Sequence, residues 1–369
     1  MPDSWGNLDD FARGVLRDRA AAQLSEDEVD VPIRRDEQGR VRFRLFAGTD
    51  AVGATEALEG EEYALGPPPP TEVTLIDPDD FDYEPEITAE DRAAAEPIDE
   101  AVAGLREYFA EDPGVTDEAQ AAAPDSILPP IVDHRPDQSP IKNQEERSTC
   151  VSHASLGLLE AAPHVPDDLS EQYAHYKFTE FLGRPHDRDN GLRTTDAAPF
   201  LARADGRTCL EEEWLYVPQQ ETIDTLVAAG SYAPPPSAVG NQTYGYRAYK
   251  IVGDAGLEGE SIKNTRFLES LLALGFDIVI GAWASWDDEN NRSVLRPLLD
   301  SNGQPIGRGG HAMLVVGYDR PSQYFIVKNS WAPGWGHAGY GYFNYDFMRS
   351  CLKYGFTVSA VEPAPAVDQ

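Results

Sequence analysis

The chain has 369 residues and a formal net charge of −34, from 64 Asp and Glu against 30 Lys and Arg. That length is enough for two or three lobes around a large core, whereas so acidic a chain lacks the basic face that nucleic acids and anionic membranes require. No apolar run approaches 18 residues and no apolar leader opens the chain, so we expect neither a membrane span nor a secretory signal. These features favour a cytoplasmic protein, with signal-independent export left open.

The first 128 residues form a separate acidic region. Residues 1–130 hold 33 acidic and 10 basic side chains, a net of −23, whereas the remainder holds 31 and 20, a net of −11. Such a region suits one of three roles: an inhibitory extension, a docking arm for a protein partner, or a solubilising tail.

Within this region the sequence predicts two helices and a strand. Apolar residues recur at helical spacing over 7–24 and again over 98–109. Val41, Phe43 and Leu45 alternate with arginines, which indicates a strand. A proline run, an acidic stretch and a linker separate these elements from one another and from the rest of the chain, at 67–70, 76–96 and 111–128.

The next part of the chain, up to about residue 235, reads as helical. Helices are predicted over 151–161, over an aromatic-rich segment at 169–182, and over 195–203. The proline-rich stretch 232–236 then breaks the chain and marks a crossover between lobes.

The last part changes character and reads mainly as strands. One helix is expected at 264–274, because Asn264 is a favourable N-cap and Gly275 a helix stop. The predicted strands are 276–284, 312–318, 324–328, 340–344 and 356–361. Helices followed by strands indicate an α+β fold with a helical lobe at 129–235 and a β lobe at 236–369.

Three side chains in distinct local settings suit nucleophilic catalysis. Cys150 opens a predicted helix, His311 opens an apolar strand after two glycines, and Asn329 ends another strand before Trp331. A thiol attacks, an imidazole takes its proton, and an amide orients the imidazole. Gln144, six residues before the thiol, carries an amide that can donate to a developing oxyanion, as can N–H groups at the helix N-terminus, whose dipole also favours a thiolate.

These motifs resemble the papain-like cysteine peptidases. The resemblance rests on Pro140 to Gln144 with Cys150 six residues later, on His311 to Tyr318, and on Lys328 to Trp331 followed by two glycine-aromatic repeats. It implies a helical lobe and an antiparallel β lobe with the active site between them, and it is closest to divergent bacterial members. It also implies a protein or peptide substrate and no cofactor.

The resemblance further suggests substrate contacts and shows departures. Gly191 and Leu192 stand where the family has two glycines beside the substrate backbone, Gly310 precedes the histidine, and Trp331 resembles the tryptophan that shields the Asn–His hydrogen bond. A cysteine that usually forms a disulfide is replaced by Arg147.

Two other functions remain open at this point. The same residues would serve an amidase, an acyltransferase or a deamidase, and a non-catalytic member could bind peptides or partners.

No metal-binding spacing of histidine and cysteine and no phosphate-binding glycine loop occurs. Three cysteines, an odd number, favour a reducing compartment, although Cys209 and Cys351 are free to pair in principle.

Overall fold

The computed structural model describes four short N-terminal strands and residues 128–363, apart from 163–164, 167, 187–190, 193, 202–205, 243, 253–261, 288–293 and 307–308. The four strands form two antiparallel pairs, β1 (Val29–Asp30) with β4 (Phe46–Ala47) and β2 (Ile33–Arg35) with β3 (Val41–Phe43). Strand β3 lies where Val41 and Phe43 predicted one. The predicted helices at 7–24 and 98–109, with the proline, acidic and linker segments, lie outside the described residues.

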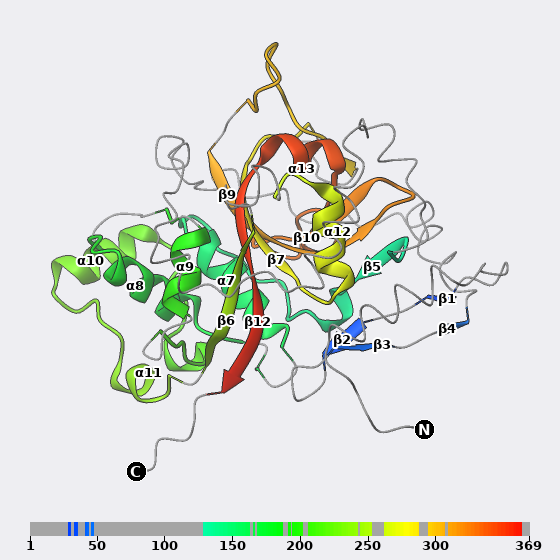
Figure 1. The fold of residues 1–369 in the computed structure, drawn as a ribbon. Helices are drawn as coiled ribbons and strands as arrows, with labels where there is room; N and C mark the ends of the chain where they lie inside the picture. The colour runs from blue at the N-terminus through cyan, green and yellow to red at the C-terminus, as the bar shows by residue number, and fades with distance from the viewer. Residues whose placement is uncertain are drawn as a thin grey trace, which may run out of the picture.

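The helices of residues 128–363 lie on both sides of the sheet, one group on the left and centre of Figure 1 and the other on the right. The first group comprises α7 (Cys150–Glu160), α8 (Glu171–Phe181), α9 (Thr194–Leu201), α10 (Gln220–Ala228) and α11 (Pro236–Gly240). The second comprises α12 (Thr265–Ala273) and α13 (Tyr345–Cys351). Helix α12 is capped as predicted, because the Asn264 side chain accepts from Phe267 N at 3.2 Å and Gly275 follows with φ +85°.

One sheet of eight strands forms the centre of the molecule. Its path is β6 (Tyr244–Val252), β12 (Leu352–Pro363), β7 (Ile278–Trp283), β9 (Gly310–Asp319), β10 (Tyr324–Lys328), β11 (Tyr340–Asn344) and β8 (Val294–Leu295), with β5 (Ile131–Asp133) added on β9. All pairs are antiparallel except β11 with β8. Separate helices and a mostly antiparallel sheet confirm the predicted α+β class.

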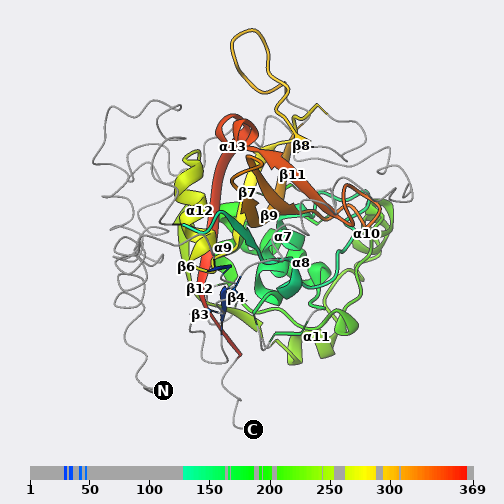
Figure 2. The same ribbon diagram turned by 90° about the vertical axis from the view of Figure 1, so that its right-hand side faces the viewer.

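Both faces of this sheet are covered, which explains why its central strands are apolar without alternation. Along β9, Ala312, Leu314 and Val316 belong to the core shared with α7 to α9. Met313 and Val315, on the opposite face, belong to the core shared with α12 and α13. Figure 2 shows the sheet between these two groups of helices. Burying one such side chain contributes about 1.5–3 kcal/mol, so two cores on one sheet fix its register firmly.

Strand β5 shows that the two lobes interleave in sequence. It lies in the segment predicted to be helical, yet it pairs with β9 through Asp133 and Gly317. A Cβ atom on Gly317 would stand 2.2 Å from Val132 O, so only glycine allows this close approach. The division of residues 129–369 into two lobes at residue 235 therefore remains a prediction.

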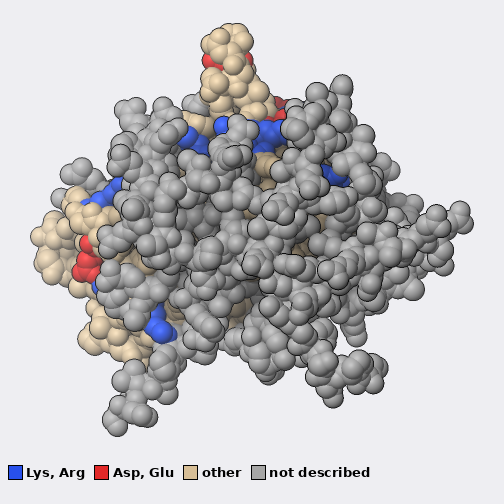
Figure 3. All heavy atoms as spheres, in the orientation of Figure 1, with Lys and Arg blue, Asp and Glu red and all other residues tan. Residues whose placement is uncertain are grey.

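A long hairpin joins β8 to β9 and projects from the top of Figures 1 and 3. Asp300 closes its tip by accepting from Asn302 N at 2.7 Å and Gln304 N at 2.9 Å. These bonds lower the pKa of Asp300, and acidic atoms are visible at the tip in Figure 3. In the part of the chain that the structure describes, no helix combines the length and hydropathy that a bilayer span requires.

A buried ion pair links the residue after β5 to the residue before β7, and its contribution to stability depends on pH. His134 Nδ1 lies 2.6 Å from Asp277 Oδ1, and both side chains are less than a tenth exposed. Burial alone would lower the pKa of His134, but Asp277 outweighs it and raises the pKa above 6.5. The pair therefore stabilises fully below pH 6.5, and its contribution is lost as the pH rises through the folded-state pKa.

We expect Asp277→Asn to reduce the free energy of unfolding by about 1.5–3 kcal/mol below pH 6.5, the range for a hydrogen bond to a charged group. The loss should shrink at higher pH, because neutral His134 bonds an amide nearly as well. Urea unfolding of parent and variant at several pH values measures this. A loss that is the same at every pH would contradict the ion pair.

Candidate active site

His311 and Asn329 meet at the start of β9 and the end of β10. His311 Nε2 lies 2.8 Å from Asn329 Oδ1, and both side chains are buried. Trp331 stacks on the imidazole, with ring centroids 4.5 Å apart and planes 27° from parallel. The ring therefore has a fixed plane, with water excluded from the bond to Asn329. Its other nitrogen, Nδ1, is buried and makes no hydrogen bond to any described residue.

Gln144 is held at both ends of its side-chain amide. Its Oε1 accepts from Ser330 Oγ at 2.7 Å, and its Nε2 donates to the backbone oxygen of Arg147 at 2.9 Å. Its backbone N–H also donates to Ser330 O at 2.8 Å, beside a bridge between Asn143 and Trp331. The segment before the predicted nucleophile is thus joined directly to the turn that carries Asn329.

Cys150 is the first residue of α7, which packs on β9, and its side chain is fully buried. The N-cap residue, Thr149, does not cap the helix with its side chain. Its hydroxyl instead pairs with Tyr216 Oη at 2.7 Å, and that phenol donates to Gln144 O at the same distance. Positive potential at the helix N-terminus acts on the thiol from this side.

The surroundings of His311 and His153 keep both imidazoles neutral. Burial is the main cause that lowers the pKa of His311 to about 4, opposed by Asn329 and helped by His153. Burial likewise lowers the pKa of His153 to about 3, with Lys142 and Arg147 adding to the shift. His153 donates from Nδ1 to Thr149 O at 3.0 Å and packs edge-on against Tyr216, which is a structural role.

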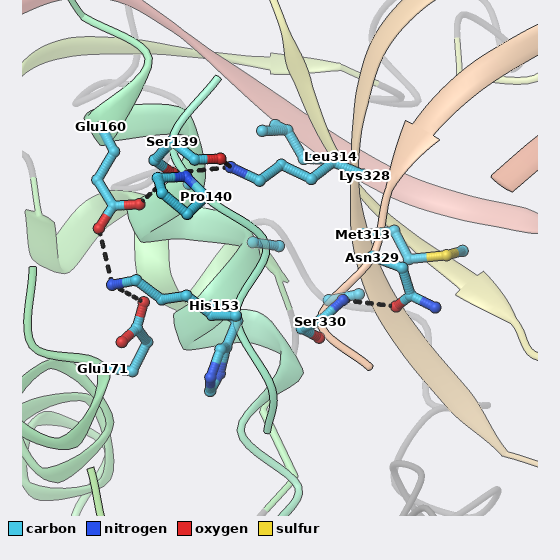
Figure 4. Close-up of a pocket in the computed structure, with 14 residues that line it drawn as sticks. Ser139, Pro140, His153, Glu160, Glu171, Met313, Leu314, Lys328, Asn329 and Ser330 are labelled. Carbon is cyan, nitrogen blue, oxygen red and sulfur yellow. Dashed lines mark hydrogen bonds and ion pairs between the residues drawn. The ribbon is translucent and has the colours of Figure 1, made fainter. Parts of the chain in front are cut away.

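A group of buried charges lies behind α7, between it and β10 (Figure 4). Lys142 Nζ is 2.9 Å from Glu160 and 2.8 Å from Glu171. Burial opposes the charge on Lys142, but Glu171 and Glu160 outweigh it and raise its pKa. Lys328 Nζ donates to Ser139 O and Oγ at 2.9 and 2.8 Å. Lys142 lies in the segment before Cys150, Glu160 in α7, Glu171 in α8, and Lys328 directly before Asn329. Their contacts therefore join these four parts of the chain.

Burial shifts the pKa values of this group in opposite directions. It raises the pKa of Glu160 to about 7 and that of Glu171 in the same direction, despite the attraction of Lys142. It lowers the pKa of Lys328 to about 8. A cavity of about 20 Å³ lies among these side chains, with room for one water molecule. Asn329 and Ser330 line it, whereas Cys150, His311 and Gln144 do not, so the cavity lies beside the site.

The predicted substrate contacts take different positions. Gly310 is the first residue of β9 and pairs with Trp283. Gly191 O accepts from Arg184 Nη1 at 2.6 Å. Leu192 is 1% exposed and packs in the core of the helical lobe, so the structure gives its side chain a packing role. Substrate contact by these residues and by Trp331 stays a prediction.

None of the three cysteines is in a disulfide. Cys209 packs with Tyr173 and Ala238, whereas Cys351 lies in the core beneath α12. Burial raises the pKa of both thiols to about 12. Within the described residues no group of three or more His, Cys, Asp or Glu side chains is placed to hold a metal ion.

Sequence reasoning missed three parts of this site. Ser330 stands out in the sequence only as part of a motif, although its hydroxyl orients Gln144. Tyr216 lies far from the other residues in the chain, and nothing local marks it. The buried lysines and glutamates look like ordinary surface charges in the sequence, because their burial arises only when distant elements pack.

Comparison with known proteins finds similarity to papain family cysteine proteases. Residues 299–359 match the family model described as papain family cysteine protease, a stretch that holds His311 and Asn329. The chain is 24% identical over 247 residues to cathepsin O of Homo sapiens, covering 64% of this chain and 68% of that protein. It is also 24% identical over 270 residues to cathepsin K of Mus musculus, covering 67% and 68%.

The fold has a solved counterpart in a bacterial enzyme. Xylellain, a cysteine protease from Xylella fastidiosa, superposes with a TM-score of 0.56 at 22% identity, over 80% of this chain and 98% of that one. This likeness concerns the fold. Together with the family match over residues 299–359 and the cathepsin relatives, it supports the resemblance to papain-like cysteine peptidases that the sequence motifs suggested, and the chain has a papain-like fold.

Proposed function

We propose that the protein hydrolyses peptide bonds with Cys150 as nucleophile, His311 as general base and acid, Asn329 as the residue that orients His311, and Gln144 as an oxyanion donor. Cys150 Sγ attacks the peptide carbonyl carbon and its proton passes to His311. The C–N bond then breaks as His311 returns the proton to the leaving amine. Water attacks the acyl-enzyme and gives a proton to His311; the C–S bond then breaks, the acid leaves, and His311 returns the proton to Cys150 Sγ.

The observation that carries the proposal is the His311–Asn329 hydrogen bond of 2.8 Å under Trp331. It uses Nε2 and leaves Nδ1 for proton transfer. Because burial lowers the pKa of His311 to about 4, the imidazole is neutral at pH 7 and can accept the thiol proton. A side chain that was merely packed would not need this fixed tautomer.

The Gln144 amide supports the oxyanion role. Its Nε2 carries two N–H groups, of which Arg147 O takes one, and the other can donate to an oxyanion. Removing one oxyanion donor typically lowers kcat by about 10²–10³-fold.

A peptidyl chloromethyl ketone tests the proposal. We expect it to alkylate Cys150 in the folded protein and to leave Cys209 and Cys351 unmodified, since burial raises the pKa values of both thiols to about 12. Mass spectrometry of the digested protein locates the label. Urea-unfolded protein is the control, in which all three thiols should react alike. Equal labelling in the folded state would argue against an activated nucleophile.

The same triad would also serve acyl transfer, so the acceptor needs its own assay. Incubating the enzyme with a peptide substrate and an added amine separates the two reactions. Free acid as the main product supports hydrolysis, whereas a predominant amide of the added amine would assign an acyltransferase.

A further inference from the structure

Arg147 is a large cation buried three residues before the predicted nucleophile. It is 1% exposed, and its side-chain partners among the described residues are the neutral groups of Gln172, Val217 and Tyr232. Its Nη1 donates to Gln172 Oε1 at 2.8 Å and to Val217 O at 2.9 Å. A buried charge satisfied by neutral oxygens is expensive and uncommon in proteins. Its contacts therefore call for an explanation beyond core packing.

The aromatic partners of Arg147 lead back to the active site. The guanidinium carbon lies 5.4 Å from the centre of the Tyr216 ring, a cation–π geometry. The hydroxyl of Tyr216 donates to Gln144 O at 2.7 Å and also pairs with Thr149 Oγ1 at 2.7 Å. The Tyr216 side chain, on which Arg147 packs, therefore holds residues 216–217 against both ends of the loop formed by residues 144–149.

Hydrogen bonds of the Arg147 backbone also hold the loop 144–149 together. Its carbonyl oxygen accepts from Gln144 Nε2 at 2.9 Å and from Thr149 N at 2.8 Å, and its N–H donates to Gln144 O at 3.3 Å. The direction of the Gln144 amide thus depends on where the Arg147 carbonyl stands. That position is set by the side chain, which is anchored on α8 through Gln172 and on residue 217.

We propose that Arg147 is the positioning residue of the oxyanion hole: its buried guanidinium fixes the loop whose carbonyl aims the Gln144 amide. This inference rests on the proposed function, since it assigns the support of one of its catalytic groups. Arg147 acts through Gln144 and does not itself touch the substrate.

Arg147→Met tests the proposal, because methionine keeps much of the aliphatic stem and removes the donors. Gln172 Oε1 keeps a partner in Val217 N at 3.1 Å, so the variant leaves few unpaired groups. We expect kcat to fall by about 30–100-fold, a large part of the effect of losing an oxyanion donor. KM should change by less than about threefold, because the interaction is made mainly in the transition state.

Two readouts separate positioning from a merely structural role. Alkylation of Cys150 by iodoacetamide forms no oxyanion, so its rate should stay close to that of the parent in Arg147→Met. The double variant Gln144→Ala/Arg147→Met should be no slower than Gln144→Ala, since residues that act through one group are non-additive. Arg147→Lys retains a cation with donors and should recover part of kcat; it also serves if the methionine variant does not fold.

Arg135→Met is the matched control. Arg135 also lies over a tyrosine ring, 5.9 Å from the centroid of Tyr342, and donates to that hydroxyl at 2.9 Å, but it contacts none of the loop 144–149. Its kinetics should equal those of the parent.

The outcomes distinguish the inference from the function on which it rests. Parental kcat in Arg147→Met, beside an impaired Gln144→Ala, would overturn the inference alone. Alkylation slowed as much as hydrolysis, or additive losses in the double variant, would also overturn it. Parental kcat in Gln144→Ala would remove the oxyanion role of Gln144 and this inference together, and a parent that does not react at Cys150 would overturn the proposed function.

Discussion

Cys150→Ala is expected to lower kcat/KM for peptide hydrolysis by on the order of 10⁴-fold or more, because the change removes the thiol on which the proposed acyl-enzyme forms. The fold should survive. Cys150 is 0% exposed within the core that includes α7, and loss of one sulfur atom destabilises by about 1 kcal/mol. Steady-state hydrolysis of a fluorogenic peptide, with the thermal unfolding midpoint measured on the same samples, checks both statements.

Cys209→Ala is the matched control for this variant. That thiol is also fully buried but lies with Tyr173 and Ala238, away from His311 and Asn329. Its removal should leave kcat unchanged. Substantial hydrolysis by Cys150→Ala, at a rate near that of Cys209→Ala, would show that another residue is the nucleophile.

Lys142→Met should destabilise the protein by about 3–5 kcal/mol, the range for breaking a buried ion pair from one side. Lys142 is 19% exposed and lies between two carboxylates that are at most 2% exposed, Glu160 and Glu171. Without the ammonium, these two groups face each other uncompensated in a site where burial already raises their pKa values. Equilibrium unfolding in urea at pH 7 measures the loss.

Two further variants give this prediction its controls. Lys177→Met removes a lysine of α8 that pairs with Glu180 at the surface, so the loss should stay below about 1 kcal/mol. The triple variant Lys142→Met/Glu160→Gln/Glu171→Gln removes all three charges and should regain part of the stability. A Lys142→Met variant within about 1 kcal/mol of the parent would mean that the group is solvated in solution.

The strands and capped helices were predictable where local signals set both ends. Asn264 and Gly275 bound α12 as expected, and the apolar runs of β9 and β10 are buried on both faces. Helix α13 was missed, although Asn344 caps it by accepting from Phe347 N at 2.9 Å. Its aromatic residues read equally well as the continuation of the preceding strand.

The sequence motifs mark the candidate site residues, but they do not reveal the side chains that hold those residues in place. Gln144, His311 and Asn329 stand in sequence motifs typical of the catalysis proposed for them. In the structure Asn329 bonds His311, Trp331 stacks on His311, and Ser330 bonds Gln144. Leu192 packs in the core of the helical lobe, a position set by tertiary packing that no local signal reveals, and its substrate contact stays a prediction. The burial of Arg147 has no local cause, because its partners lie 25 and 70 residues away.

The lack of any disulfide among the three cysteines has a practical consequence. In a cross-linked thiol enzyme, a reductant strong enough to restore an oxidised nucleophile also threatens the bonds that hold the fold. Here the redox potential of the surroundings acts on catalysis and stability separately. Oxidation of Cys150 to a sulfenic acid or a mixed disulfide can be reversed by thiols at any concentration without cutting the scaffold. On the proposed assignment of Cys150 as the nucleophile, its oxidation and reduction would switch activity off and on while the protein stays folded.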